Sequence, residues 1–288
     1  MRAQLASIPA TADQKNEDFA AVTSNVAVVI DGAGVPPDSE SGCRHGVAWY
    51  SHMLGASYVG QLADLHRPMT DCLAVAINSV NALHASTCDL GHPGSPSATV
   101  TAIRDQGDTI EYLVLADSPL ILDLASGLVI ICDDREAAIG ARYRPAMDAT
   151  ANGSVEHASA LRDYVEAMRA HRNRDGGFWV ASTEAIAAEH ALIGAVRAHD
   201  LRAAALLTDG ASRTVDRFHL MDWTDLLAQL RSHGPAALLD RVREAEASDP
   251  KGHRWPRGKA SDDATAIYIQ PDRLDQLISS WDGATDSD

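Results

Sequence analysis

Acidic side chains stand at the ends of four strand-like runs that lie far apart in this sequence. Two follow a strand as part of an Asp-Gly dipeptide, and two precede a strand as part of an acidic pair. The dipeptides are Asp31-Gly32 and Asp209-Gly210, and the pairs are Glu17-Asp18 and Asp262-Asp263. These groups come from both ends of the chain and can meet at one rim of the folded sheets. Because buried like charges repel one another, such a cluster indicates a place that a cation or protons neutralise.

The chemistry that this cluster favours is metal-assisted hydrolysis of a phosphate ester. Oxygen ligands alone select hard cations, here Mg²⁺ or Mn²⁺. Two such ions that share a carboxylate activate a water molecule and neutralise a phosphate. Taken singly, an Asp-Gly dipeptide is usually a turn, and an acidic pair before a strand is usually a solvated corner. Only the combination therefore indicates a site.

The cysteine spacing gives no support to softer metal chemistry. The four cysteines contain no Cys-x-x-C pair, which argues against a zinc ribbon and against a dithiol redox site. The twelve histidines contain no His-Glu-x-x-His motif. We therefore expect no cluster of His and Cys ligands, and reduced, mostly buried thiols at Cys43, Cys72, Cys88 and Cys132.

The order of the acidic motifs resembles that of the protein phosphatase 2C family of metal-dependent phosphatases. The resemblance spans Asp13 to Gln270. The residues that carry it are Asn16-Glu17-Asp18, Val28–Gly34, Leu206–Gly210, Asp262–Thr265 and, in the middle of the chain, Ala116-Asp117-Ser118. It implies an α+β fold, a four-layer αββα sandwich of two antiparallel sheets flanked by helices. The active centre is then expected in the cleft between the sheets.

The resemblance also implies a centre of two Mg²⁺ or Mn²⁺ ions, with a third ion in some members. Asp31 bridges the two ions, Asp18 holds metal-bound water, and Asp117 stands where the third ion binds. The implied metal ligands are Glu17, Asp31, Gly32 through its carbonyl, Asp209, Asp262 and Asp117. The implied catalytic residues are Asp31, Asp209 and Asp18.

The implied activity is that of a metal-dependent serine/threonine protein phosphatase, a hydrolase of phosphate monoesters. A water or hydroxide that bridges the two ions attacks phosphorus in a single displacement, and phosphoserine or phosphothreonine in proteins is the favoured substrate. The sequence has no Cys-x5-Arg nucleophile loop, in agreement with a reaction without a phosphoenzyme. The expected partner is accordingly a phosphorylated protein.

Some positions depart from the family pattern. Asp13 stands four residues before Glu17, where the family usually has an Arg that grips the substrate phosphate. Replacements are sought among Lys15, Arg44, His45 and Arg213. Val35 stands where the family's Asp-Gly-x-Gly-Gly motif has its last Gly. Ala33 stands where some members have a His, and Asp263 stands where the family usually has an Asn. Two alternatives therefore stay open, a regulatory binding module of the same fold that does little chemistry and a phosphatase for a small metabolite.

Composition and charge exclude several other classes of protein. The 288 residues are 45% hydrophobic and carry a formal net charge of −16. That charge argues against binding to nucleic-acid phosphates or to an anionic membrane surface, since both need basic patches. No run approaches the ~20 apolar residues of a membrane helix, and the first residues lack the apolar core of a signal peptide. We expect a cytoplasmic protein, and its oligomeric state stays open.

The elements that position the acidic residues do not alternate strictly, which argues against a doubly wound parallel sheet and favours antiparallel sheets covered by helices. Strands are expected at 19–22, 25–30, 98–104, 109–116, 120–124, 128–132, 177–181, 203–208 and 264–270, with 98–132 as one antiparallel meander. Helices are expected at 44–65, 69–83 (capped by Thr70 or Asp71), 158–171, 183–196, 222–232, 235–247 and 274–281. We expect an N-terminal extension at 1–12, a single domain at 13–281 and a disordered tail at 282–288.

Overall fold

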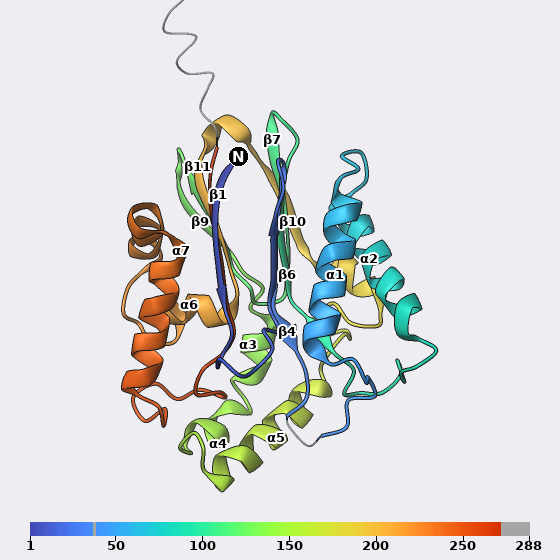
Figure 1. Ribbon diagram of the computed structural model, residues 1–288, viewed down its shortest axis with the longest axis vertical. Helices are drawn as coiled ribbons and strands as arrows, with labels where there is room; N and C mark the ends of the chain where they lie inside the picture. The colour runs from blue at the N-terminus through green and yellow to red at the C-terminus, as the bar shows by residue number, and fades with distance from the viewer. Residues whose placement is uncertain (37–38, 272–288) are drawn as a thin grey trace, which may run out of the picture.

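Two antiparallel sheets pack face to face in the computed structural model, which describes residues 1–36 and 39–271 (Figure 1). Helices α1 (Val47–Leu62) and α2 (Met69–His84) cover the outer face of one sheet. Helices α6 (Asp209–Asp216) and α7 (Trp223–Ser248) cover the outer face of the other. The four-layer αββα sandwich implied by the sequence is therefore confirmed.

Each sheet joins segments from distant parts of the chain. The first sheet has the order β1 (Arg2–Ile8), β12 (Ala264–Gln270), β11 (Leu201–Leu207), β8 (Leu120–Leu124) and β9 (Gly127–Ile131). The second has the order β10 (Leu192–Arg197), β7 (Thr109–Leu115), β6 (Val100–Asp105), β3 (Val26–Ile30) and β2 (Phe19–Val22). A small ladder pairs β4 (Gly32–Ala33) with β5 (Ser97–Ala98).

The interior strand β3 shows how the layers are held together. Successive side chains of a strand point to opposite faces. Ala27 and Val29 enter the core between the two sheets, while Val28 and Ile30 enter the core under α1 and α2. Because both faces of β3 are covered, all five of its residues are buried. The strand is therefore a rigid base for Asp31, which follows it directly.

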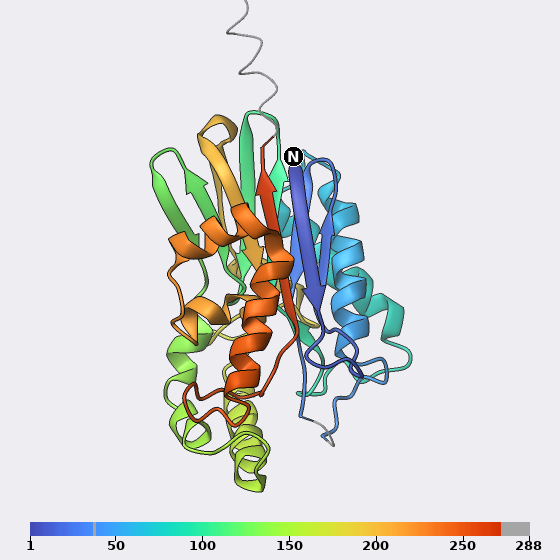
Figure 2. The same ribbon diagram turned by 60° about the vertical axis from the view of Figure 1, so that its left-hand side comes forward.

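Short helices extend the molecule beyond one end of the sandwich. They are α3 (Arg135–Gly140), α4 (Arg144–Asp148) and α5 (Val155–Arg169), which lie below the sheets in Figures 1 and 2. In the part of the chain that the structure describes, none of the helices has the length and apolarity needed to cross a membrane. The end of the sandwich that these helices cover is the end at which β3 and β11 finish.

The expected meander at 98–132 is wrong. Strands β6 and β7 pair in the second sheet, and β8 and β9 pair in the first, so the chain changes sheet between Leu115 and Leu120. Ala116 takes a left-handed conformation there with a φ of 68°. The Thr99 and Ser118 hydroxyls, 2.6 Å apart, tie this crossing to the second sheet. The crossing places Asp117 at the end of the sandwich that α3, α4 and α5 cover.

The helix expected at 183–196 is also wrong. Residues Ala185–His190 form a 3-10 helix (η1), a second short 3-10 turn (η2) covers Ala198–Asp200, and between them β10 pairs with β7 along six residues. The sequence also gave no sign of α3 and α4. The expected strand at 177–181 is reduced to isolated bridges at Phe178 and Ala181.

Several element ends differ from the expectation. Helix α2 begins after Pro68 without a side-chain cap, so neither Thr70 nor Asp71 caps it. The helices expected at 222–232 and 235–247 join into α7 across a kink at Gly234, whose φ is 78°. Residues 1–12, expected to form an extension, include β1, which pairs with β12. The helix expected at 274–281 and the tail at 282–288 lie outside the described residues.

Candidate metal centre

Asp31 lies where β3 ends, between the two sheets. The Asp31 backbone N–H donates to the Thr99 hydroxyl at 3.2 Å, and the Asp31 carbonyl accepts the Thr99 N–H at 2.9 Å. Loss of hydration and the negative charges of Asp18, Asp209 and Asp262 raise the pKa of its carboxyl well above the ordinary value. The centre therefore brings Asp31 near the acidic groups of three other segments.

The pair Glu17-Asp18 approaches from the strand beside β3. Burial raises the pKa of Asp18 to about 8, although the Thr208 hydroxyl donates to its Oδ2 at 3.0 Å and favours the ionised form. The other oxygen, Oδ1, is buried without a hydrogen-bond partner among the described residues. Burial raises the pKa of Glu17 as well. An uncompensated buried carboxylate oxygen is the kind of atom that a cation satisfies.

Glycine is required after both Asp residues of the Asp-Gly dipeptides, because another acidic segment passes close to each. A Cβ at Gly32 would lie 2.6 Å from the carbonyl oxygen of Glu17. A Cβ at Gly210 would collide with the carbonyl oxygen of Asp263. The two dipeptides are therefore places where two acidic segments touch, and Asp209 is the first residue of α6.

Asp263 holds the Glu17 segment by its backbone. Its Oδ2 accepts the Glu17 N–H at 2.7 Å and its Oδ1 accepts the Ala10 N–H at 2.7 Å. An Asn, which the family usually has here, offers one acceptor oxygen and could not accept both bonds with its amide. The departure at this position therefore has a structural use, which is to fix the N-terminal segment against the start of β12.

Asp262 differs from the other acidic residues because two cations already bind it. Lys259 Nζ lies 2.7 Å from its Oδ1, and the Arg213 guanidinium lies 2.8 Å from its Oδ2. Burial alone would raise the pKa of Asp262, but Lys259 and Arg213 outweigh burial and lower it. The carboxylates Asp31 and Asp209 also stabilise the charged form of Lys259. Lys259 is thus an internal counter-charge of the centre.

Asp117 and two further acids form a second group around Asp209. Burial and the charges of Asp209, Glu136 and Asp216 raise the pKa of Asp117 to about 8. Burial also raises the pKa values of Glu136 and Asp216. Sequence reasoning did not single out Glu136 or Asp216, although Asp216 lies on the same short helix as Asp209, two turns along.

A cleft of about 600 Å³ opens beside this centre. Of the residues expected at metal ions, Asp31, Gly32, Asp117, Asp209 and Asp262 line it, whereas Glu17 and Asp18 are not among its described lining residues. The cleft reaches from the centre to the inner side of α4 and α5, where Tyr164 and Met168 line it. A substrate group can therefore reach the acidic residues from the end of the sandwich.

The expected replacements for the family's phosphate-gripping Arg are mostly not at the cleft. Asp13 is exposed, and among the described lining residues only Arg213 of the four candidates Lys15, Arg44, His45 and Arg213 occurs. Arg213 is buried and paired with Glu246 at 2.7 Å and with Asp262. The arginines missed by sequence reasoning are Arg144, Arg169, Arg172 and Arg217. Arg217 could have been found from the sequence, because positions 209, 213 and 217 are spaced by four residues and share one helix face.

The donor chemistry of the centre fits hard divalent cations. Glu17, Asp18, Asp31, Asp209 and Asp262 offer only oxygen, the set that Mg²⁺ and Mn²⁺ prefer. The raised pKa values of Glu17, Asp18 and Asp31 indicate that the protein alone does not neutralise these three groups, whereas the pKa of Asp262 is lowered by its cationic partners. Arg213 and Lys259 hold Asp262, so an ion at that carboxylate would have to share it with them.

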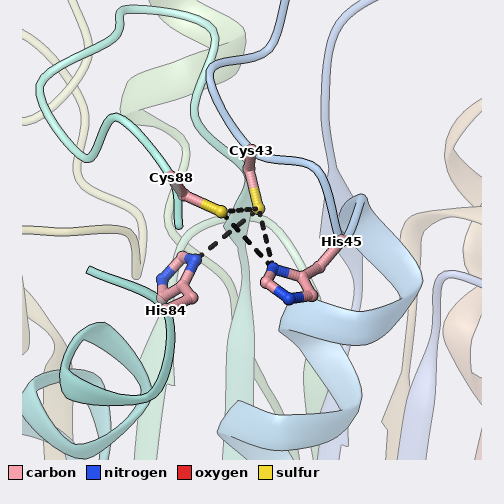
Figure 3. Close-up of side chains that lie close together, drawn as sticks. All are labelled: Cys43, His45, His84 and Cys88. Carbon is pink, nitrogen blue, oxygen red and sulfur yellow. Dashed lines mark hydrogen bonds between the residues drawn. The ribbon is translucent and has the colours of Figure 1, made fainter. Parts of the chain in front are cut away.

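The expectation that the chain has no cluster of His and Cys ligands is wrong. Cys43, His45, His84 and Cys88 come together beside the start of α1, with their ligand atoms all within 4.8 Å of one another (Figure 3). All four cysteines are free, as expected, but only Cys43 and Cys72 are buried. The sequence signal was present as Cys43-x-His45 and His84-x3-Cys88.

Comparison with known proteins places the chain in a family. The catalytic domain of the serine/threonine protein phosphatase PstP in complex with two manganese ions superimposes with a TM-score of 0.53 and 16% identity, over 93% of this chain and 97% of that one. PstP/Ppp of Mycobacterium tuberculosis gives a TM-score of 0.54 and 18% identity, over the same shares of 93% and 97%. Stp1 of Staphylococcus aureus gives 0.55 and 12%, over 94% of each chain. These likenesses show the shared fold.

Sequence comparison gives the family itself. No curated protein matches the chain by sequence. The sequence profile of protein phosphatase 2C, however, matches residues 10–242, which include all the proposed metal ligands except Asp262. Since that match covers most of the chain, the chain belongs to the protein phosphatase 2C family.

Proposed function

We propose that this chain is a divalent-metal-dependent phosphatase that hydrolyses phosphoserine and phosphothreonine in proteins. The observation that carries the proposal is the meeting of carboxylates from four remote segments beside a cleft that is also lined by arginines. Family membership supports it, as do similar structures named as serine/threonine phosphatases, one of them with two manganese ions.

The residues proposed to hold two Mg²⁺ or Mn²⁺ ions are Glu17, Asp31, Gly32 through its carbonyl, Asp209 and Asp262, with Asp117 at a third ion. When bound, such ions neutralise charge on the phosphate and lower the pKa of a water molecule, which then attacks phosphorus. Asp18 contributes its unpartnered Oδ1 as a hydrogen-bond acceptor, and the Thr208 hydroxyl fixes the carboxylate through Oδ2. Lys259 and Arg213 keep Asp262 ionised.

Arg144 and Arg217 are proposed to bind the phosphate of the substrate. Both line the cleft, and burial together with the charge of Arg144 lowers the pKa of Arg217. The Arg144 Nε is buried without a hydrogen-bond partner in the described part of the chain. Arg144 pairs with Asp148 only at 3.7 Å, and two guanidinium groups that repel one another beside a cleft form a place for an anion. This pair would take the role of the Arg that Asp13 replaces.

The test is hydrolysis of a phosphothreonine peptide and of a chromogenic phosphate ester with Mn²⁺. Asp31→Asn and Asp209→Asn are expected to lower kcat/KM by at least about 100-fold, because each removes a charged metal ligand. Asp240→Asn, an exposed position on α7, is the matched control and is expected to leave the rate unchanged. Equal rates for the two site variants and the wild type would exclude the proposed centre.

The alternative of a regulatory binding module keeps one specific observation in its favour. Lys259 and Arg213 already occupy the Asp262 carboxylate, and Asp13 stands where the family usually has a phosphate-binding Arg. Calorimetric titration with Mn²⁺ separates the two functions. Metal binding without turnover of several phosphopeptides would favour the module, and turnover of small phosphate esters alone would favour a metabolite phosphatase.

A further inference from the structure

Four side chains outside the cleft bring two sulfurs and two imidazole nitrogens within 4.8 Å of one another. Figure 3 shows Cys43, His45, His84 and Cys88 pointing toward a common centre. Cys43 Sγ lies 3.6 Å from Cys88 Sγ, 3.6 Å from His84 Nδ1 and 3.9 Å from His45 Nδ1. Cys88 Sγ lies 3.4 Å from His45 Nδ1. We infer that these four residues bind one zinc ion.

The distances agree with those that zinc imposes on its ligands. Zinc–sulfur bonds of about 2.3 Å and zinc–nitrogen bonds of about 2.0–2.1 Å place tetrahedral ligands about 3.8 Å apart for two sulfurs and about 3.6 Å apart for sulfur and nitrogen. The four separations given above, 3.4–3.9 Å, lie around these values, and all four ligand atoms are within 4.8 Å of one another. A set of two sulfurs and two imidazole nitrogens in a tetrahedron is typical of structural zinc.

Other uses of the cluster fit less well. A disulfide needs a sulfur–sulfur distance near 2.05 Å, and Cys43 and Cys88 lie 3.6 Å apart with both thiols free. A catalytic Cys–His pair needs a substrate pocket, but these residues are not among the described lining residues of the cleft. Sulfhydryl hydrogen bonds are weak and do not by themselves explain why four ligand groups meet.

The backbone positions the ligands from two short segments. His84 is the last residue of α2, and the Cys88 N–H donates to the His84 carbonyl at 3.0 Å, which turns Cys88 back beside it. Cys43 and His45 come directly before α1, in a segment whose Gly42 carbonyl accepts the Asp89 N–H at 2.9 Å. A backbone hydrogen bond therefore joins the two segments that carry the four ligands.

Aromatic packing closes the site on one side. The Trp49 ring, in the first turn of α1, stacks on His45 with centroids 4.4 Å apart and lies 5.0 Å from the His84 ring. Cys43 and His84 are buried, with 8% and 2% of their surfaces exposed. Binding of Zn²⁺ releases the two thiol protons and leaves both imidazoles neutral, so the ion carries two thiolates and no net charge results at the site.

The ion would join the start of α1 to the end of α2. These two helices cover the second sheet, and the residue before α1, Gly46, provides no side-chain cap. Zinc here would fix the helix pair and the small β4–β5 ladder next to it, whose Gly32 and Ser97 line the cleft. The site is structural and independent of the proposed phosphatase activity.

The test is the metal content of the full chain, expressed in a reducing cytosol and purified without metal-affinity resin or chelator. Inductively coupled plasma mass spectrometry should give one zinc per chain in the wild type and in Asp31→Asn/Asp209→Asn. Cys43→Ser/Cys88→Ser should contain less than about a tenth of that, since two ligands are lost. Cys72→Ser/Cys132→Ser, the matched control, should keep it.

Two measurements do not depend on the folding of a variant. Wild-type protein loaded with Co²⁺ should show thiolate-to-cobalt charge transfer and the visible absorption of tetrahedral Co²⁺. Zinc should protect two of the four cysteines from alkylation. A wild type without zinc, a Cys43–Cys88 disulfide, or zinc that is lost with Asp31 and Asp209 and kept without the two cysteines would overturn the inference.

Discussion

The Cys/His cluster and the carboxylate centre are two candidate metal sites that the fold prepares in opposite ways. The cluster's ligand atoms all lie within 4.8 Å of one another, and among the described residues no other set of three or more His, Cys and acidic side chains does so. Neutral thiols and imidazoles can touch without an ion, whereas carboxylates repel one another until charge is supplied. Distances therefore identify the Cys/His cluster, and perturbed pKa values identify the carboxylate centre.

The two sites also differ in how they are neutralised. At the carboxylate centre the protein supplies Lys259 and Arg213 to Asp262, and it favours protons on Asp18 and Asp117. At the Cys/His cluster, the ion itself displaces the thiol protons. We expect the carboxylate centre to exchange ions readily and the Cys/His cluster to keep its ion.

Removal of weakly held metal should give the largest effect. Exhaustive dialysis against metal-free buffer is expected to lower phosphatase activity by at least about 100-fold, because oxygen sites release hydrated Mg²⁺ or Mn²⁺ readily. Added Mn²⁺ should restore the rate. Zinc measured in the same sample should remain at one per chain. Loss of zinc with retention of activity would contradict the expectation that the Cys/His cluster holds its ion more tightly than the carboxylate centre does.

The stability of the metal-free protein should depend on pH through the carboxylate centre. The pKa of Asp18 is raised from 3.8 to about 8, so the folded state binds this proton more tightly than the unfolded state does. The stability that this proton gives is present at low pH and is lost as pH rises from about 4 to about 8.

Thermal unfolding of metal-free protein across this range measures the effect. The midpoint should fall with rising pH in the wild type, less steeply in Asp18→Asn, and little or not at all with saturating Mn²⁺, which favours the ionised carboxylates. Cys43→Ser should keep the wild-type slope. Identical slopes for wild type and Asp18→Asn would show that Asp18 does not titrate in this range.

A smaller effect is expected from the proposed phosphate-binding arginines. Arg217→Met should raise KM for a phosphothreonine peptide by about tenfold, the value of one charge-assisted hydrogen bond, and change kcat less. Arg44→Met is the matched control, since Arg44 is exposed beside the Cys/His cluster and does not line the cleft. If Arg44→Met raised KM and Arg217→Met did not, the substrate would bind nearer the cluster.

Much of the fold was predictable from local pattern. Continuous apolar runs identified β3 and β11, and the acidic residues at their ends followed. The strand β10 was not predicted, because it is an edge strand whose Leu192 and Ile193 are exposed, so its apolar spacing carries no strand period. The change of sheet after Leu115 depends on packing between sheets, which turn residues alone do not reveal.

The candidate centre was predictable to the extent that its residues follow sequence motifs. Arg144 and Arg217 were missed because only the fold brings their two charges near one another. The Cys/His cluster was missed for two reasons. Its two ligand pairs, Cys43-x-His45 and His84-x3-Cys88, lie far apart in the sequence, and neither pair has a spacing that is common in zinc sites. His84 and Cys88 face one another only because the chain turns back after α2.

The pairing of β1 with β12 sets an order of events during synthesis. The first strand stays without its neighbour until residues 264–270 have left the ribosome, and Glu17 stays without Asp262 and Asp263 for just as long. All four Cys and His ligands, by contrast, are made within the first third of the chain. A nascent chain can therefore take up zinc well before it becomes able to act on a phosphate, which keeps an unfinished polypeptide inactive until its last strand arrives.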